Sequence, residues 1–482
     1  MSGRVALADL PDRFDLIIVG GGINGAGILR EAARTSLRVL LLEQGDFASA
    51  TSSASSKLIH GGLRYLKTGQ WRLTLESVRE RRRLLREVPE LVEPLEFLMP
   101  IYRGVPPGKW TMRIGLWLYD WMAGQSNSRW LDPAAALGLE PTIRSDGLQG
   151  AMHYLDAQTD DARLVMRLIT EAQAVGGAGS RLVARNYTRV SRLLERDGVV
   201  TGVAIEDLPS GLVRDLRARL VIQATGADVG LSPDAPKIRP LRGSHFVFPP
   251  SKLPVRRAVS WLHPADRRPI FAYPWLGAIV YGTTDLDHHG ASARTPRMSR
   301  SESDYLIAGL AHQFPQLKLS ATDALSSYAG VRPVVAGGKD NPSAESRESV
   351  LWSRPGLVGL AGGKLTTFRV TARHILKEAA RQLPELAPAK EQGLFAPRDL
   401  SARRVLEDLR GTLQQEQVIH LDDLMLRRTR LGLTEPAGAV ALLPEARQLC
   451  QQELGWDDAR WGREQARYLR LWQENHAPVV PA

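Results

Sequence analysis

The feature that most constrains this chain is a glycine-rich turn near its start. Asp15 to Val19 is a short apolar run, and Gly20-x-Gly22-x-x-Gly25 follows it directly. The next residues carry apolar side chains at helical spacing, and a second apolar run ends at Glu43. A strand, a glycine turn, a helix and a strand that ends in an acid form the dinucleotide-binding βαβ unit. The sequence therefore predicts a Rossmann-like α/β domain that binds a nucleotide cofactor.

Each glycine of the turn has a physical role in that unit. Gly20 permits the tight turn, Gly22 lets the backbone approach a pyrophosphate, and Gly25 lets the helix pack on the strand. The N-terminal end of the following helix, which includes Ile23 and Asn24, offers unpaired N–H groups and a partial positive charge to the pyrophosphate. Glu43 stands 18 residues after Gly25 (43 − 25), so we expect it to hold the ribose hydroxyls.

Length and cysteine content narrow the class of protein. The chain has 482 residues, which favours two or three domains, and one cysteine, Cys450, which excludes an internal disulfide. A thiolate metal site is therefore not expected, and the predicted setting is cytoplasmic. Residues 1–14 lack the apolar core of a secretory signal. There is no run of about 18 uncharged apolar residues, so we expect no membrane span.

The net charge of +11 fits nucleic acid, an anionic membrane surface or an anionic substrate. The densest basic run, Arg79 to Arg86, lies in a helical pattern with interleaved glutamates, which favours a solvated helix face. There is no zinc-finger spacing or RNA-binding signature beside it, so nucleic acid is not the expected partner.

A second informative stretch runs from Ala48 to Leu66. It is rich in serine, threonine and alanine, which fits a flexible linker, but it leads into a chemically dense set, namely Lys57, His60, Gly61, Gly62, Arg64 and Tyr65. Small hydroxyl residues can follow the phosphates and sugars of a cofactor at close range. Together with the glycine turn, the string from Thr51 to Leu66 resembles the FAD-dependent glycerol-3-phosphate dehydrogenase family.

Other strings match the same family. They are Asp160 to Leu164, Gly243-Ser244-His245, Gly282-Thr283-Thr284-Asp285, Gly330-Val331-Arg332-Pro333 and Gly362-Gly363-Lys364-Leu365-Thr366-Thr367. The last one follows an apolar run, Leu357 to Ala361, and opens a helix. A second helix N-terminus would stabilise the negative charge of a reduced flavin ring. Taken without the resemblance, structural roles are favoured for His245, Arg332 and the 282–285 string, and the 362–367 string fits a structural or a functional role equally well.

The resemblance implies FAD as the cofactor, and it implies a set of residues that contact FAD. These are Gly20, Gly22, Ile23, Asn24, Gly25, Glu43, Thr51, Ser52, Ser53, Lys57, Leu58, His60, Gly61, Val183, Ala224, Gly226, Gly363, Lys364, Leu365 and Thr366.

The rest of the chain is divided by its periodicity. Residues 67–105 have a helical pattern broken at Pro89 and Pro94. Strands are expected over 182–190, 199–206 and 218–224, the last two joined by a turn at Pro209-Ser210-Gly211, and 240–335 is mostly antiparallel strand with a helix over 302–313. Ala224-Thr225-Gly226 is expected to return the chain to the cofactor.

The stretch from Lys109 to Met122 is apolar and rich in tryptophan, with basic residues at its start. It is either a buried packing helix or an interfacial helix that lies on a membrane. Asp120 argues against deep burial in lipid.

The predicted fold is thus an FAD-binding domain of the glycine-oxidase and D-amino-acid-oxidase type, with an antiparallel substrate domain and a helical C-terminal extension. Its expected parts are 14–240, with a helical insertion over about 67–150, then 241–335, 336–385 and 400–482. Leu424 to Arg430 resembles the C-terminal domain of the family. That domain is usually larger, so the dimer and membrane contacts assigned to it in relatives, and the oligomeric state, stay open.

The resemblance implies oxidation of sn-glycerol 3-phosphate at C2, with the electrons passed on to a membrane quinone. We expect His245 to be the base, since its ordinary pKa of about 6.5 leaves it mostly neutral, and Arg332 to hold the C2 oxygen. Arg64, Tyr65 and Thr284 are expected to bind the phosphate, and Lys364 to lie near flavin and substrate or to act as the base instead.

Two other classes of function stay open. The first is an oxidase or dehydrogenase for another hydroxy or amino acid, which would lack the phosphate cations. The second is a non-catalytic flavoprotein, which would lack His245 or Arg332.

Overall fold

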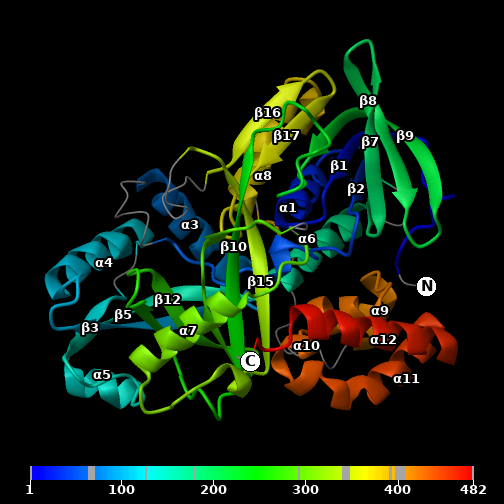
Figure 1. The fold of residues 1–482 in the computed structure, drawn as a ribbon. Helices are drawn as coiled ribbons and strands as arrows, with labels where there is room; N and C mark the ends of the chain where they lie inside the picture. Colours follow the sequence, from blue (N-terminus) through cyan, green and yellow to red (C-terminus); the bar gives the residue numbers. More distant parts are fainter. Residues whose placement is uncertain are drawn as a thin grey trace.

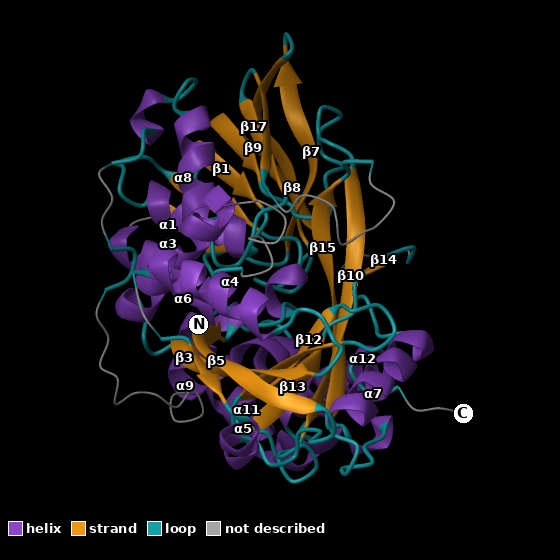
Figure 2. Cartoon of the chain, turned by 90° about the vertical axis from the view of Figure 1, so that its left-hand side faces the viewer, coloured by secondary structure: helices purple, strands orange, loops and turns teal. Residues whose placement is uncertain are grey.

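A computed structural model describes residues 3–62, 71–124, 127–176, 181–290, 294–338, 348–389, 393–396 and 409–479 of the chain. Figure 1 shows two sheets, one above the other, with the C-terminal helices beside the lower one. The long strands β10 (Ile238–Phe248) and β15 (Ser326–Val335) pair with each other and run between the two regions (Figures 1 and 2).

The upper sheet contains the predicted nucleotide-binding unit. Its central strand β1 (Arg13–Val19) pairs in parallel with β2 (Val39–Leu42) and with β9 (Leu212–Gln223). The order continues through β17 (Leu357–Ala361) and β16 (Val350–Arg354) on one side and β6 (Leu182–Arg185) on the other. The strand predictions for 15–19, 199–206, 218–224 and 357–361 are confirmed, whereas 182–190 holds two strands, β6 and the start of β7 (Thr188–Arg196).

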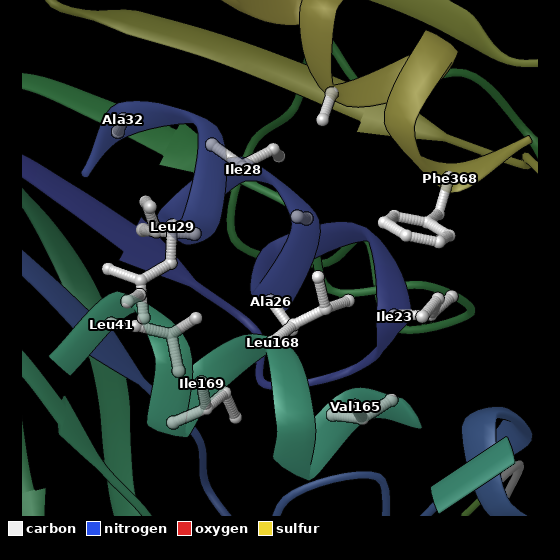
Figure 3. Close-up of a cluster of buried hydrophobic side chains, with 14 of the residues drawn as sticks. Ile23, Ala26, Ile28, Leu29, Ala32, Leu41, Val165, Leu168, Ile169 and Phe368 are labelled. Atoms are coloured by element: carbon white, nitrogen blue, oxygen red, sulfur yellow. The ribbon is translucent and has the colours of Figure 1, made fainter. Parts of the chain in front are cut away.

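Alternate residues of β1 face opposite layers, as the period of a strand requires. Leu16 and Ile18 face the helical core, and Ile17 and Val19 pack with residues of β7 and β8 (Val199–Asp207). On the helical side, α1 (Ile23–Ala32) lies between α6 (Asp161–Gly176) and α8 (Phe368–Ala379), where its apolar side chains meet those of both neighbours (Figure 3). The strand and the helix on either side of the glycine turn are thereby fixed by buried apolar contacts.

The second sheet is mostly antiparallel. Its order is β14 (Leu286–Asp287), β10, β13 (Ala278–Gly282), β12 (Pro269–Trp275), β11 (Ala258–Leu262), β3 (Val92–Tyr102), β5 (Leu148–Thr159) and β4 (Arg129–Leu131), with β15 on β10. The antiparallel pattern predicted for 240–335 is confirmed, and so is the helix over 302–313, which is α7 (Arg300–Gln313).

The prediction of helices throughout 67–105 was wrong in its second half. Helix α3 (Trp71–Glu87) is present, but 92–102 forms β3, which pairs with β5 along its length. Leu95 and Phe97 are buried while Glu96 between them is exposed, which is the alternation of a strand. Pro94 breaks a helix, but it fits this strand because only a backbone donor is lost. The insertion therefore builds part of the second sheet as well as α3, α4 (Lys109–Ala123) and α5 (Pro133–Leu139).

The prediction of a solvated face for the basic run 79–86 was also wrong in part. Arg81 is buried in α3 and donates hydrogen bonds to the Asp156 carboxylate, at 2.5 Å, and to the Tyr119 hydroxyl, at 2.8 Å. Glu80 is buried as well and accepts two hydrogen bonds from the Arg369 guanidinium of α8. Two charges of the run thus tie α3 to the rest of the fold.

The C-terminal part of the chain is helical, as predicted. It consists of α9 (Leu409–Gln415), a π-helical segment (Asp423–Arg428), α10 (Leu431–Thr434), α11 (Leu443–Leu454) and α12 (Asp458–Asn475). Their apolar side chains share one buried cluster with Val247 of β10 and Val280 of β13. Among the described residues, no helix combines the length and the apolar character needed to cross a membrane.

Candidate active site

A cavity of 1630 Å³ extends from the glycine turn of the upper sheet to residues of the second sheet. Gly20, Gly22 and Asn24 line it on the side of the upper sheet, and Phe271 of β12 and Arg332 of β15 line it on the side of the second sheet. One continuous space therefore joins the predicted nucleotide site to the predicted substrate site.

The glycine turn has the geometry that the sequence predicts. Gly20 adopts φ +114°, in the region that favours glycine. A Cβ added to Gly25 would lie 1.8 Å from the backbone oxygen of Gly20, so a side chain there would separate α1 from the turn. Helix α1 has no side-chain cap at Gly22. The N–H of Ile23, the first residue of α1, donates to Ser52 Oγ instead, and we expect the helix N-terminus to face the pyrophosphate of the cofactor.

Glu43 lines the cavity at the end of β2, close to the turn. Its carboxylate accepts hydrogen bonds from the backbone N–H of Gly21, at 2.7 Å, and of Gly45, at 2.8 Å. Burial raises the pKa of Glu43, while these two backbone donors act in the opposite direction. Its proposed role toward the ribose stays a prediction.

The second strand–glycine–helix junction lies directly against the first. The side-chain amide of Asn24 donates a hydrogen bond to the backbone oxygen of Gly362, at 3.0 Å, although 338 positions separate them. Gly363, Lys364, Leu365 and Thr366 line the cavity just before α8 begins. The two junctions and the long cavity that both of them line fit a dinucleotide with a flavin ring near 362–366.

The hydroxyl-rich stretch wraps the same cavity. Ser52 Oγ accepts a hydrogen bond from the N–H of Ile23, at 3.0 Å, and Thr51 Oγ1 donates to the backbone oxygen of Val331, at 2.6 Å. We call residues 43–57 the cofactor loop, since most of them line the cavity. The ammonium of Lys57 forms a fully buried ion pair with Asp161, at 3.1 Å.

At the substrate end, a buried carboxylate joins two arginines. Asp285 Oδ1 lies 3.1 Å from Arg332 Nη1, and Asp285 Oδ2 lies 2.9 Å from Arg268 Nη1. Both arginines and Thr283 line the cavity. Arg268, Asp285 and Thr283 are site residues that the sequence reasoning left out. Asp285 stands in a matched motif, and the Arg267-Arg268-Pro269 string before β12 is the available sequence signal for Arg268.

Thr284 does not line the cavity. Its hydroxyl accepts a hydrogen bond from the N–H of Ser244, at 2.9 Å, and donates one to the buried Glu302 carboxylate, at 2.7 Å. Both hydrogen-bonding directions of this hydroxyl are thus used inside the protein, and the neighbouring Thr283 faces the cavity.

His245 lies in β10, one layer behind the cavity wall. Its Nε2 is 2.9 Å from Ser56 Oγ, and Ser56 lines the cavity. The imidazole stacks on the Tyr328 ring, with 4.7 Å between the centroids. Burial lowers the pKa of His245 well below its ordinary value, and the charges of Arg332 and Lys57 lower it further. The lowered pKa favours the neutral imidazole, whose Nε2 shares a hydrogen bond with the Ser56 hydroxyl.

Most of the predicted FAD residues are brought together along this cavity. Those that line it are Gly20, Gly22, Ile23, Asn24, Glu43, Thr51, Ser52, Lys57, Leu58, His60, Ala224, Gly226, Gly363, Lys364, Leu365 and Thr366. Gly25, Ser53, Gly61 and Val183 stand behind the wall; Val183 is buried in β6 beside Leu40. Arg64 and Tyr65 lie outside the described residues.

Helix α4 carries an exposed apolar face beside the cavity. Its side chains Trp110, Ile114, Trp117 and Trp121 lie at spacings of four, three and four residues and are 64–71% exposed; we call them the aromatic stripe. Thr111, Ile114, Gly115 and Leu118 of the same helix line the cavity. The predicted alternative of a wholly buried packing helix is therefore wrong for this face.

Comparison with known proteins agrees with this geometry. The FAD dependent oxidoreductase family matches residues 15–377, and the C-terminal domain of alpha-glycerophosphate oxidase matches residues 371–461. The aerobic glycerol-3-phosphate dehydrogenase of Bacillus subtilis is 37% identical over 382 residues, which are 77% of this chain and 68% of that protein. Its counterpart in Staphylococcus haemolyticus is 34% identical over 385 residues, 78% and 68% of the two chains.

Solved structures show the same fold. The glycerol-3-phosphate dehydrogenase of Bacillus halodurans, complexed with FAD, superposes with a TM-score of 0.74 at 25% identity and covers 96% of this chain and 95% of its own. Glycine oxidase from Geobacillus kaustophilus superposes with a TM-score of 0.56 at 21% identity, over 80% and 100% of the two chains. The predicted glycine-oxidase type of fold and the FAD cofactor are confirmed.

Proposed function

The chain belongs to the FAD-dependent oxidoreductase family and to its aerobic glycerol-3-phosphate dehydrogenases, and from this membership we propose that it oxidises sn-glycerol 3-phosphate at C2 to dihydroxyacetone phosphate. One observation carries the proposal for this site. Arg268 and Arg332, which share the Asp285 carboxylate, and Lys364 line the same cavity, and cationic side chains of this kind bind a small phosphorylated alcohol. Bound FAD would supply the hydride acceptor for C2, and the glycine turn and residues 363–366 would hold it in the cavity.

The protein groups have separate tasks in this proposal. Arg332, oriented by Asp285, holds the C2 oxygen and favours its negative charge as the hydroxyl proton leaves. Arg268, on the other oxygen of Asp285, binds the phosphate together with Thr283 and with the predicted Arg64 and Tyr65. Lys364 lies beside both flavin and substrate.

The hydroxyl proton passes to His245 through Ser56. A general base must be within hydrogen-bond reach of the proton, directly or through one intervening hydroxyl. The 2.9 Å contact between Ser56 Oγ and His245 Nε2 supports this route, and the lowered pKa of His245 keeps the accepting nitrogen unprotonated. Lys364 is the competing base.

The proposed electron acceptor is a quinone, reached from a membrane surface on which α4 lies. Tryptophans with basic neighbours are typical of helices in the membrane interface, and Arg113 lies 5.0 Å from the Trp110 ring centre. Asp120, which argued against this placement, accepts hydrogen bonds from the N–H groups of Asn127 and Ser128 and so is satisfied by the protein. Ile114 of the aromatic stripe also lines the cavity, which supports a path for an apolar acceptor from the bilayer toward the cofactor.

A steady-state assay tests the catalytic proposal. Purified protein should be yellow, and glycerol 3-phosphate should drive reduction of a quinone analogue much faster than reduction of dioxygen. Lactate and glycine serve as unphosphorylated control substrates. Equal or higher rates with a control substrate would contradict the substrate assignment, and preference for dioxygen would contradict the acceptor.

Vesicle binding tests the membrane proposal. Trp117→Glu should weaken sedimentation with vesicles of anionic phospholipid while the rate with a soluble quinone analogue is kept. Val213→Glu changes an equally exposed apolar residue, 75% exposed on β9, and is the matched control. If both variants bind vesicles like the wild type, α4 is not the membrane contact.

A further inference from the structure

Three buried arginines reach from the C-terminal part of the chain into the FAD-binding part. They are Arg427 and Arg428, at the end of the π-helical segment Asp423–Arg428, and Arg430 just after it. None of them lines the cavity, so they do not contact the cofactor or substrate space directly. We call them the arginine turn.

Two of these arginines converge on Asp46 near the start of the cofactor loop. Arg428 holds it with two parallel contacts, Nη1 to Oδ2 at 2.7 Å and Nη2 to Oδ1 at 2.8 Å, and Arg427 Nε adds a third at 2.6 Å. Burial alone would raise the pKa of Asp46, but the two guanidinium groups lower it to about 2. Asp46 is thus a permanently charged anchor for this end of the loop.

Arg430 holds the other end of the loop. Its Nε and Nη2 contact Asp160 Oδ1 at 2.9 and 2.8 Å, Nη2 also contacts Asp161, and Nη1 donates to the backbone oxygen of Ser53 at 3.3 Å. Asp161 in turn accepts from the Ser55 hydroxyl, at 2.6 Å, and pairs with Lys57.

The segment between these anchors is the part of the cofactor loop that meets the glycine turn. The N–H of Ala48 donates to the backbone oxygen of Gly21, at 3.1 Å, and Ser52 Oγ accepts from the N–H of Ile23. A displacement of either anchor therefore moves residues that border the expected pyrophosphate position.

We propose that Arg427, Arg428 and Arg430 are positioning residues that hold the cofactor loop in the conformation that retains FAD. The C-terminal helical part then controls how long the flavin stays bound, although it contributes no side chain to the cavity wall from this turn. The inference depends on FAD as the cofactor and not on the proposed substrate.

The test is the rate at which holoenzyme loses FAD on dilution, followed by the rise in free flavin fluorescence. We expect Arg428→Met and Arg430→Met to release FAD about ten- to a hundredfold faster than the wild type. Arg430→Lys keeps the positive charge but loses the paired guanidinium donors, so its release rate should be intermediate. The matched control is Arg163→Met. Arg163 Nη2 pairs with Glu416 Oε1 at 2.9 Å and joins the same two parts of the chain without touching the cofactor loop.

The control separates positioning from general stability. If the arginine turn positions the loop, all methionine variants unfold at lower temperature, but FAD release is accelerated only in the variants of the turn. If Arg163→Met accelerates release as much as Arg430→Met, or if Arg430→Lys and Arg430→Met both release FAD at the wild-type rate, the proposal is overturned. Should the methionine variants fail to fold, the comparison of Arg430→Lys with Arg163→Lys decides the question in the same way.

Discussion

Replacing His245 by asparagine tests the proton route of the proposed reaction. Asparagine keeps a polar side chain near Ser56 but cannot take up a proton at working pH. Loss of a general base commonly costs about 10²–10⁴-fold, or roughly 3–5 kcal/mol of barrier. Because Ser56 stands between His245 and the cavity, its hydroxyl can still hydrogen-bond the substrate in the variant. We therefore expect the lower part of that range, about 10²–10³-fold, in the rate of flavin reduction at saturating substrate.

The pH profile gives the prediction a second, independent readout. Burial first, and then the charges of Arg332 and Lys57, lower the pKa of His245 well below its ordinary value. The wild-type reduction rate should therefore be flat across neutral pH and fall only in acid, where the ring becomes protonated. Stopped-flow flavin reduction across pH measures this step, which should vanish in His245→Asn.

The same pKa shift has a consequence for stability. Below about pH 6.5 the unfolded chain takes up a proton at this histidine, while the folded ring stays neutral down to its lowered pKa. This contribution to stability is thus fully present above pH 6.5 and is lost as the pH falls toward the folded-state pKa. His245→Asn should remove it, so the unfolding free energy of the variant should depend less on pH in mild acid.

Tyr328→Phe is the matched control for these measurements. The Tyr328 ring stacks on His245, and its hydroxyl donates to the backbone oxygen of Ser55 at 3.1 Å. Its loss should cost about 1 kcal/mol of stability without changing the pH step. Near-wild-type reduction by His245→Asn would refute the reasoning and leave His245 an orienting residue. A pH step that disappears in Lys364→Met instead would assign the base to Lys364.

Three further predictions concern the cations, the carboxylate that orients them and the glycine turn. Arg64→Ala should lower kcat/KM for glycerol 3-phosphate by about ten- to a hundredfold through loss of a charge-assisted contact, and should affect unphosphorylated glycerol far less; an equal loss on both substrates would remove Arg64 from the phosphate site. Asp285→Asn removes the buried negative charge that Arg268 and Arg332 share, so we expect kcat to fall by about tenfold or more while the FAD content stays the same. An unchanged kcat would show that the carboxylate does not orient the two arginines. Gly25→Ala should give colourless protein that takes up no FAD on reconstitution, since the added Cβ would lie 1.8 Å from a backbone oxygen; flavin absorbance after gel filtration measures this, and a yellow variant would contradict the packing argument.

Local sequence patterns were sufficient to predict the cofactor end of the site. Gly20, Gly25 and Glu43 belong to one continuous strand–turn–helix–strand unit, and their spacing predicts which backbone groups meet the cofactor. The strings that match the family added the second junction at Gly362 and Gly363, and the structure brings it to Asn24 of the first.

Tertiary structure decided which side chains face the cavity. In Gly282-Thr283-Thr284-Asp285 the sequence could not distinguish the two threonines, and the buried Glu302 carboxylate, which comes from another element, engages Thr284. His245 is likewise separated from the cavity by Ser56, which lies 189 positions from it in the sequence. These orientations depend on contacts between distant strands and helices, which no local spacing encodes.

Long-range charge pairing and burial were also beyond the sequence. Arg81 and Glu80 stand in a run that is typical of a solvated helix. Both side chains are nevertheless buried, because they pair with Asp156 and Arg369, which lie far from them in the sequence. The sequence by itself determined the cofactor class, because a glycine turn is a local steric requirement. Only the folded chain decided the substrate end and the arginine turn, because a buried charge needs a partner, and partners are chosen by three-dimensional packing.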